Sequence, residues 1–108
     1  MDDIDELVAA AARHDEHAWH ALWASIEPPL SRLLAQPHFL GPHDACDDDR
    51  EHIVVAVHER LRADRFARLQ LYLDAKRANP RLRFSSWLQV VAKRAGIDYL
   101  RAREELAR

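Results

Sequence analysis

The sequence predicts an all-α protein with one domain and one core. Only 2 of the 108 residues are glycine and 5 are proline, whereas alanine, leucine and arginine, which favour helix over sheet, are abundant. Apolar residues recur every three or four positions, and no segment shows the alternation of a strand. Hydrophobic residues make up 48% and charged residues 31% of the chain, which is typical of a globular protein and not of a disordered one.

The first half of the chain contains two predicted helical segments. Residues 2–13 begin with several acidic side chains, which the positive end of a helix dipole favours. Asp15 is expected to cap a second helix, because its carboxylate can accept the free N–H groups of the first turn. Pro28 and Pro29 are expected to end or kink this helix, and a further helical piece follows at 30–36.

The second half contains two longer helices. One of the aspartates at 47–49 is expected to cap the third helix, and its pattern continues to Asn79 and Pro80, where it stops. The last helix is expected to begin at Ser85 or Ser86 and to run close to the end of the chain. The apolar positions of the third helix lie on one face: Ile53, Val54, Val57 and Leu61.

The last helix has a second face that is not ordinary solvated surface. At 100° per residue its core face contains Leu88, Val91, Ala92, Ala95, Tyr99, Ala102 and Leu106. Another side contains Trp87, Val90, Arg94, Ile97 and Arg101, flanked by Gln89 and Lys93. An aromatic ring can stack on unpaired bases and arginine neutralises phosphate, so this face suits single-stranded nucleic acid. Alternatively, Trp87 and Val90 pack on the preceding helix.

Charge is divided unequally along the chain. Residues 1–63 carry 5 arginines against 13 acidic residues, a net charge of −8, and residues 64–108 carry 11 basic against 5 acidic residues, a net charge of +6. A basic half can attract phosphate, although helix surfaces also vary in charge without function. The acidic N-terminus is unlike a signal peptide, no apolar run is long enough for a membrane span, and the single cysteine suits a reducing compartment. We therefore expect a cytoplasmic protein without a membrane partner.

Motifs for catalysis or cofactor binding are not expected. His38, His43 and Cys46 lie in one loop, but they lack the second cysteine and the spacing of a zinc site. The side chains of His14 and His17, and those of His17 and His20, spread around a helix instead of converging. No nucleophile elbow or phosphate-binding loop is present in the sequence. The sequence therefore predicts no enzyme activity, no cofactor and no metal.

Two segments resemble a known family. FSSWLQVVAKRAGIDYLRAREE, residues 84–105, resembles the end of region 2 of extracytoplasmic-function sigma factors of the sigma-70 class, F-x-x-W-L-x-x-[IV]-A-R-N-x-x-x-D-Y-L-R-R. The matching positions are Phe84, Trp87, Leu88, Val91, Ala92, Lys93, Asp98, Tyr99, Leu100 and Arg101. HDEHAWHALWASIEPPLSRLL, residues 14–34, resembles the family's opening segment through Asp15, Ala18, Trp19, Leu22, Trp23, Pro28 and Leu30.

The resemblance implies a compact three- to four-helix bundle like sigma-70 region 2. Such a domain binds the clamp helices of bacterial RNA polymerase core and partly single-stranded promoter DNA at the −10 element. Lys93, Arg94, Asp98 and Arg101 occupy the DNA-side positions of the family. Together with the second face of the last helix, the predicted DNA-binding residues are Trp87, Gln89, Val90, Lys93, Arg94, Ile97, Asp98 and Arg101. An anti-sigma factor or another regulatory protein is a further candidate partner.

The polymerase-docking segment of the family resembles HIVVAVHERL, residues 52–61. The resemblance makes Glu51, His52, Val55, Ala56, Glu59 and Arg60 the candidate partner-binding residues. The family's Gln-Glu pair falls here on Val55 and Ala56, which supply neither its hydrogen bonds nor its charge. The alternative function is therefore a protein-interaction module that keeps the sigma fold and binds another regulator or a second copy of itself.

The resemblance ends where region 2 ends. Full-length family members continue into region 4, a helix-turn-helix module for the −35 element, and these 108 residues contain no counterpart. This pattern is compatible with three explanations: a segment of a longer protein, a stand-alone region 2 that works with a partner, or a relative with a changed target.

Overall fold

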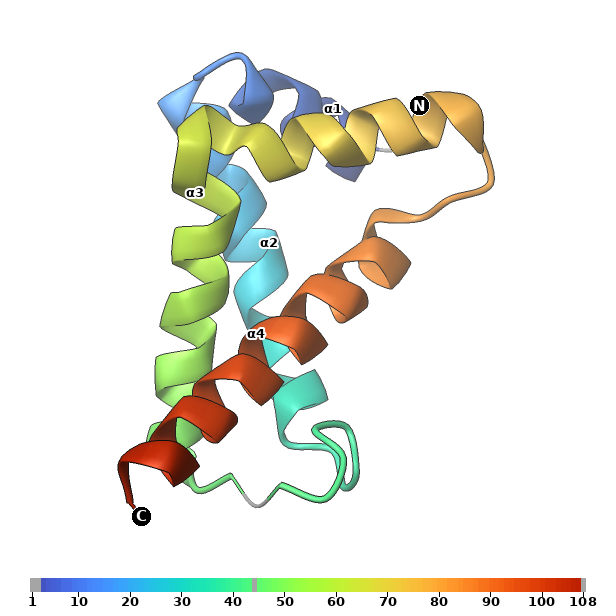
Figure 1. Cartoon of the computed structure of the whole chain (residues 1–108). Helices are drawn as coiled ribbons and strands as arrows, with labels where there is room; N and C mark the ends of the chain where they lie inside the picture. The colour runs from blue at the N-terminus through green and yellow to red at the C-terminus, as the bar shows by residue number, and fades with distance from the viewer. Residues whose placement is uncertain (1–2, 44, 108) are drawn as a thin grey trace.

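The computed structural model describes residues 3–43 and 45–107 and contains four helices in this part of the chain (Figure 1). They are α1 (Asp3–Ala12), α2 (Glu16–Leu34), α3 (Asp47–Ala78) and α4 (Phe84–Leu106). The described residues form no strand, which confirms the all-α prediction. None of the described helices has an apolar stretch sufficient to cross a membrane. Residue 2, which the sequence places in the first helix, lies outside the described residues.

The start of α2 was predicted correctly, but its interior was not. The Ala18 N–H donates a hydrogen bond to Asp15 Oδ1 at 3.1 Å, so Asp15 is the expected cap. Pro28 and Pro29 do not end the helix, which continues to Leu34, and a separate piece at 30–36 is wrong. Both prolines are exposed, and the helix carbonyls that lose their donors belong to exposed residues one turn earlier, where water can replace the missing bonds.

The ends of α3 and α4 differ slightly from the prediction. Cys46 occupies the cap position of α3, and its backbone N–H donates to the Asp49 carboxylate at 3.1 Å, so none of the aspartates at 47–49 is the cap itself. The α3 helix ends at Ala78 before Asn79, as predicted. For α4, Arg83 precedes the first helical residue, and neither Ser85 nor Ser86 is the cap.

A break divides α3 into two arms. Asp64, Arg65 and Phe66 have φ angles of 54°, 58° and 63°, a left-handed turn without a glycine. The first arm, residues 47–62, runs beside α2, and the second arm, residues 67–78, turns across the top of the molecule near α1 (Figure 1). Phe66 is buried at the turn, with its ring centroid 5.4 Å from that of Trp19. L-residues are disfavoured in this backbone conformation, so the turn is strained. The burial of the Phe66 ring against Trp19 offsets this strain.

Replacing Arg65 with glycine is expected to raise the free energy of unfolding by about 1 kcal/mol. Glycine removes the steric cost of the left-handed conformation, about 1–2 kcal/mol, and loses part of this gain to chain entropy. Arg65 is exposed, so little packing is lost. Urea unfolding measures the change. The matched control is Ala67→Gly, at an exposed position in the right-handed second arm, where glycine should lower the free energy of unfolding by about 1 kcal/mol. Destabilisation by both variants would contradict the left-handed turn.

The hydrophobic core lies between α2, the first arm of α3 and α4, and α1 and the second arm cover its upper end. Its largest fully buried side chains include Trp19, Leu22, Leu30, Ile53, Leu61, Leu69, Tyr72 and Leu100. The loop that follows α2 contributes Leu40, which packs against α4 at Gly96. A Cβ atom at Gly96 would lie 2.5 Å from Leu40 Cδ2, so the glycine permits this close approach.

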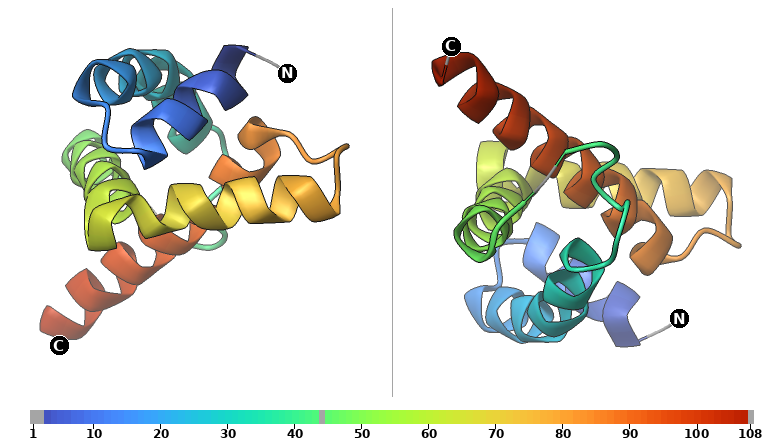
Figure 2. Two further views of the ribbon diagram at one scale, coloured as in Figure 1. Left: turned by 90° about the horizontal axis from the view of Figure 1, so that it is seen from above. Right: turned by 90° about the horizontal axis from the view of Figure 1, so that it is seen from below.

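The predicted core face of α4 is correct over its first half only. Leu88, Ala92 and Ala95 are buried, whereas Ala102 is exposed and Leu106 is 88% exposed. The end of α4 projects beyond the other helices (Figure 2), so the continued apolar spacing has nothing to pack against there. Leu100, which lies outside the predicted row, is fully buried instead.

Candidate functional site

The outer face of α4 presents basic side chains that have no acidic partner. Lys93, Arg94 and Arg101 are exposed, and none of them forms an ion pair with a residue that the structure describes. Val90 lies on the same face and is 49% exposed. This combination of free cations and an exposed apolar side chain can attract phosphate and contact an unpaired base.

Trp87 is less available than the sequence predicts. Its side chain is half-buried, and its ring centroid lies 5.5 Å from those of Tyr72 and Phe84. The alternative that Trp87 packs on the preceding helix is therefore correct for Trp87 and wrong for Val90. The tryptophan fixes α4 against the second arm of α3, so Val90 is the main exposed apolar side chain on this face.

The remaining candidates on α4 do not all share that face. Gln89 is exposed but lines a groove on the side of α4 that faces α2. Ile97 is half-buried. Asp98 is exposed and accepts a hydrogen bond from Arg60 Nη2 at 2.8 Å, which joins α4 to the first arm of α3. The expected set therefore separates into a basic face, an interhelical ion pair and a groove residue.

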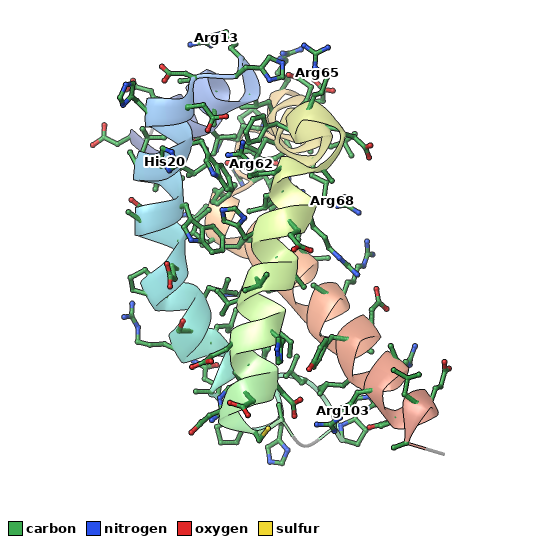
Figure 3. All side chains as sticks on the ribbon, turned by 90° about the vertical axis from the view of Figure 1, so that its left-hand side faces the viewer. Arg13, His20, Arg62, Arg65, Arg68 and Arg103 are labelled. Atoms are coloured by element: carbon green, nitrogen blue, oxygen red, sulfur yellow. The ribbon has the colours of Figure 1, made fainter. Side chains whose placement is uncertain are left out.

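Arg68 was missed by the sequence analysis. Its Nη1 donates to the Arg60 carbonyl at 3.4 Å, and Figure 3 shows its side chain projecting from α3 on the side where α4 lies. It adds a cation on the side of α3 where α4 lies. No sequence signal identifies it, because its position depends on the left-handed turn at Asp64–Phe66.

The candidate partner-binding residues lie on two sides of the first arm of α3. Glu51, Val55 and Glu59 are exposed on its outer surface, with Val55 53% exposed between the acidic side chains. His52 and Arg60 instead face α4. The His52 Nδ1 lies 3.1 Å from the Tyr99 hydroxyl, and Arg60 binds Asp98.

Ala56, the sixth candidate, is half-buried. The exposed surface of the first arm is thus an acidic ridge around one valine, which suits a partner with basic and apolar side chains.

The junction between α2 and α3 is held by an arginine that contacts both charge and aromatic rings. Arg62 donates two hydrogen bonds to Glu16, at 3.0 and 3.1 Å. Its guanidinium carbon lies 5.5 Å from the Trp19 ring centroid and 5.2 Å from that of Phe66. Figure 3 shows Arg62 between the two helices, just below the break. The hydrogen bond from Arg62 lowers the pKa of Glu16, and the same bond raises that of Arg62.

His58 fills the space between two tryptophans of α2. Its ring centroid lies 5.1 Å from that of Trp19 and 4.7 Å from that of Trp23, with both pairs edge to face. Burial lowers the pKa of His58, and the nearby charge of Arg62 lowers it further. The imidazole therefore behaves as a neutral aromatic side chain at neutral pH.

Replacing His58 with phenylalanine is expected to stabilise the protein more at pH 5 than at pH 8. Because the folded-state pKa lies below the unfolded value of about 6.5, the unfolded chain binds the proton first as the pH falls. The wild-type protein thus loses stability below about pH 6.5, and phenylalanine removes this loss. Urea unfolding at the two pH values measures it. His17→Phe, at an exposed position of α2, is the control for adding an aromatic ring. Equal changes in the pH dependence of stability for the two variants would contradict the role of His58.

The C-terminal half of α4 is anchored to the start of α3. The Asp49 carboxylate is 4% exposed and accepts hydrogen bonds from the Cys46 N–H, the Cys46 thiol and Arg103. Burial raises the pKa of Asp49, but these donors outweigh it, so the pKa lies below its usual range. His43 Nδ1 lies 2.9 Å from Glu104 Oε1 and ties the preceding loop to the same end.

Histidine and cysteine side chains form no metal centre in the part of the chain that the structure describes. No group of three or more histidine, cysteine, aspartate or glutamate residues is placed to hold an ion there. His43 and Cys46, two of the loop residues considered from the sequence, contact Glu104 and Asp49 instead. His14 lies against the Phe66 ring, at a centroid distance of 5.9 Å.

Comparison with known proteins adds no relative. No family model, curated protein or solved structure matches the chain.

Proposed function

We propose that this chain is a sigma-70 region 2-like domain that acts in transcription initiation or its regulation. The outer face of α4 binds the partly single-stranded −10 region of a promoter, and the first arm of α3 docks on RNA polymerase core. The support is the resemblance of residues 14–34 and 84–105 to region 2, together with the helical fold. This role places the domain in the cytoplasm and needs no cofactor and no catalytic group.

The observation that carries the proposal is the unpaired positive charge of α4. Lys93, Arg94 and Arg101 are exposed on one face without an acidic partner among the described residues, and the exposed Val90 precedes them on the same face. Some arginines elsewhere form ion pairs, as Arg62 does with Glu16, and others are exposed without one, so the grouping of three cations on one face distinguishes α4. Cations left free together on one helix face are available to neutralise successive phosphates.

Binding of single-stranded DNA tests this face. Arg94→Glu combined with Arg101→Glu is expected to weaken binding of a fluorescein-labelled oligonucleotide of about 20 bases at least tenfold. The slope of log affinity against log salt should fall by about 1.4, because two phosphate contacts of about 0.7 each are lost. Fluorescence anisotropy over a salt series measures both quantities.

The matched control makes the same charge change away from the outer face of α4. Arg13→Glu combined with Arg32→Glu alters two exposed arginines of α1–α2 and should leave the salt slope nearly unchanged. If both double variants weaken binding equally, the chain attracts DNA only through its overall charge and the α4 face is misassigned.

A second candidate function is a protein-interaction module, and the exposed Val55 favours it. The first arm lacks the family's Gln-Glu pair and instead presents this valine between Glu51 and Glu59. Retention of core RNA polymerase by the wild-type chain, lost in Val55→Arg, would assign the first arm to polymerase. No retention at micromolar concentration, with DNA binding intact, would assign it to another protein. Val55 suits this experiment better than Arg60, whose reversal would place a carboxylate against Asp98.

A further inference from the structure

An open groove of about 450 Å³ lies between α2 and the first turns of α4, with the start of α1 at one end. Figure 2 (right) shows these three segments facing one another. The floor of the groove consists of Ile26, Leu30, Phe84 and Leu88. These side chains belong to the hydrophobic core, so the groove reaches down to the core at a place where α2 and α4 diverge.

The upper part of the groove is accessible and combines apolar side chains with neutral polar ones such as Ser25, Ser85 and Gln89. Pro29 is exposed, and Leu33 and Ile4 are half-buried along its walls. Packing these side chains against a partner would remove apolar surface from water, at about 25 cal/mol per Å². An open apolar groove that reaches a core is a common docking place for the apolar side chains of another segment.

The charge around the groove is one-sided. Arg32 on α2 and Arg83 at the start of α4 stand on its rim, and both are exposed. Neither forms an ion pair with a described residue, and none of the described residues that line the groove is acidic. Two uncompensated guanidinium groups beside an apolar floor are complementary to a ligand that is both apolar and acidic.

The length of the groove fits a short helix. The residues of α2 that line it extend from Ser25 to Leu33, and Gln36 lines it just beyond the end of the helix. At 1.5 Å per residue this stretch of α2 corresponds to about 13 Å, or two and a half helical turns. Ile26, Pro29, Leu30 and Leu33 recur at the spacing of one helix face. Such a face accepts anchors three or four residues apart from a second helix.

We propose that this groove binds an acidic amphipathic helix of a partner protein. The apolar side chains of the helix enter the floor, and its carboxylates bind Arg32 and Arg83. The groove opens on a different side of α4 from the basic face, because Leu88 and Arg94 point about 120° apart around the helix. The inference therefore goes beyond the proposed function and does not depend on DNA or polymerase binding.

Two peptides of about 14 residues test the charge preference. Both carry leucine at every third or fourth position, and the remaining positions are glutamate in one and lysine in the other. The fluorescein-labelled glutamate peptide is expected to bind the full chain saturably and at least tenfold more tightly than the lysine peptide, as measured by anisotropy. Failure to saturate, or equal affinity for the two peptides, would overturn the proposal.

Variants locate the binding site. Arg32→Glu combined with Arg83→Glu should weaken the affinity for the glutamate peptide at least tenfold and strengthen the affinity for the lysine peptide. The control, Arg13→Glu combined with Arg94→Glu, makes the same charge change outside the groove and should keep the affinity within about twofold, since distant exposed charges are screened by salt. Circular dichroism checks that each variant folds. If both double variants lose the same affinity for the glutamate peptide, the peptide is attracted only by the overall charge of the protein, and the groove is not its binding site.

Sedimentation velocity separates a partner from a second copy of this chain. A monomer that still binds the glutamate peptide supports the proposal. A dimer that dissociates in the Arg32→Glu and Arg83→Glu variant would assign the groove to self-association and overturn it. DNA binding of this groove variant is measured alongside and should be retained, so failure of the groove and failure of the α4 face remain distinguishable.

Discussion

Replacing Trp19 with alanine is expected to lower the free energy of unfolding by about 4 kcal/mol, the cost typical of a fully buried tryptophan. Trp19 is 1% exposed and packs between Trp23, His58 and Phe66, with Arg62 over its ring. Its loss would open a cavity where α2, the first arm and the left-handed turn meet. The free energy of unfolding of a domain of this size is about 5–15 kcal/mol, so this loss is a large part of the total stability. The melting temperature should fall by about 20 °C or more.

Trp23→Ala is the matched control for this prediction. Trp23 stacks on Trp19 one turn further along α2 but is half-buried at the edge of the cluster. Its replacement should cost about 1–2 kcal/mol, because less apolar surface returns to water. Thermal and urea unfolding compare the two variants. Equal losses, or a larger loss for Trp23, would mean that the ring cluster is centred elsewhere.

Replacing Tyr72 with phenylalanine is expected to cost about 2–3 kcal/mol, although only one oxygen atom is removed. The Tyr72 hydroxyl donates to Asp5 Oδ1 at 2.6 Å, and both side chains are buried. Lys76 Nζ lies 3.8 Å from the other carboxylate oxygen. Without the hydroxyl a buried carboxylate loses a charge-assisted hydrogen bond, which is worth more than a neutral one.

A double-mutant cycle shows whether the cost belongs to the pair. Asp5→Leu combined with Tyr72→Phe removes both polar groups, so the double variant should lose clearly less than the sum of the single variants. Tyr99→Phe is the control, since its hydroxyl lies 3.1 Å from His52 Nδ1 and beside Asp49, a carboxylate that keeps its donors from Cys46 and Arg103, so the loss should cost under about 1 kcal/mol. Additive losses in the cycle would contradict the Asp5–Tyr72 contact. Urea unfolding at constant pH supplies all four values.

Local sequence signals explain the helices that were predicted correctly. The cap at Asp15, the end of α3 before Asn79 and the buried row of Leu88, Ala92 and Ala95 depend on residues within one or two turns. Pro28 and Pro29 were misread because a proline penalty depends on whether water can reach the freed carbonyls. That depends on which face of α2 the rest of the fold covers.

The break in α3 had no local signal. Asp64, Arg65 and Phe66 adopt positive φ without a glycine or asparagine to indicate it. The turn is stabilised by Phe66 packing against Trp19, a residue far away in the sequence. The break also determines where Arg68 and Tyr72 lie, and thus why Trp87 is covered instead of free.

The sequence by itself determined the helical class, the start of α2, the end of α3 and the basic, partly apolar outer face of α4, because periodicity and capping act within a few residues. Only the tertiary structure decided that Trp87 and Asp98 contact α3, that Val55 is exposed on an acidic ridge, and that α2 and α4 diverge to form a groove with Arg32 and Arg83 on its rim. These features depend on the angles at which helices pack, which are fixed by contacts between residues distant in the chain.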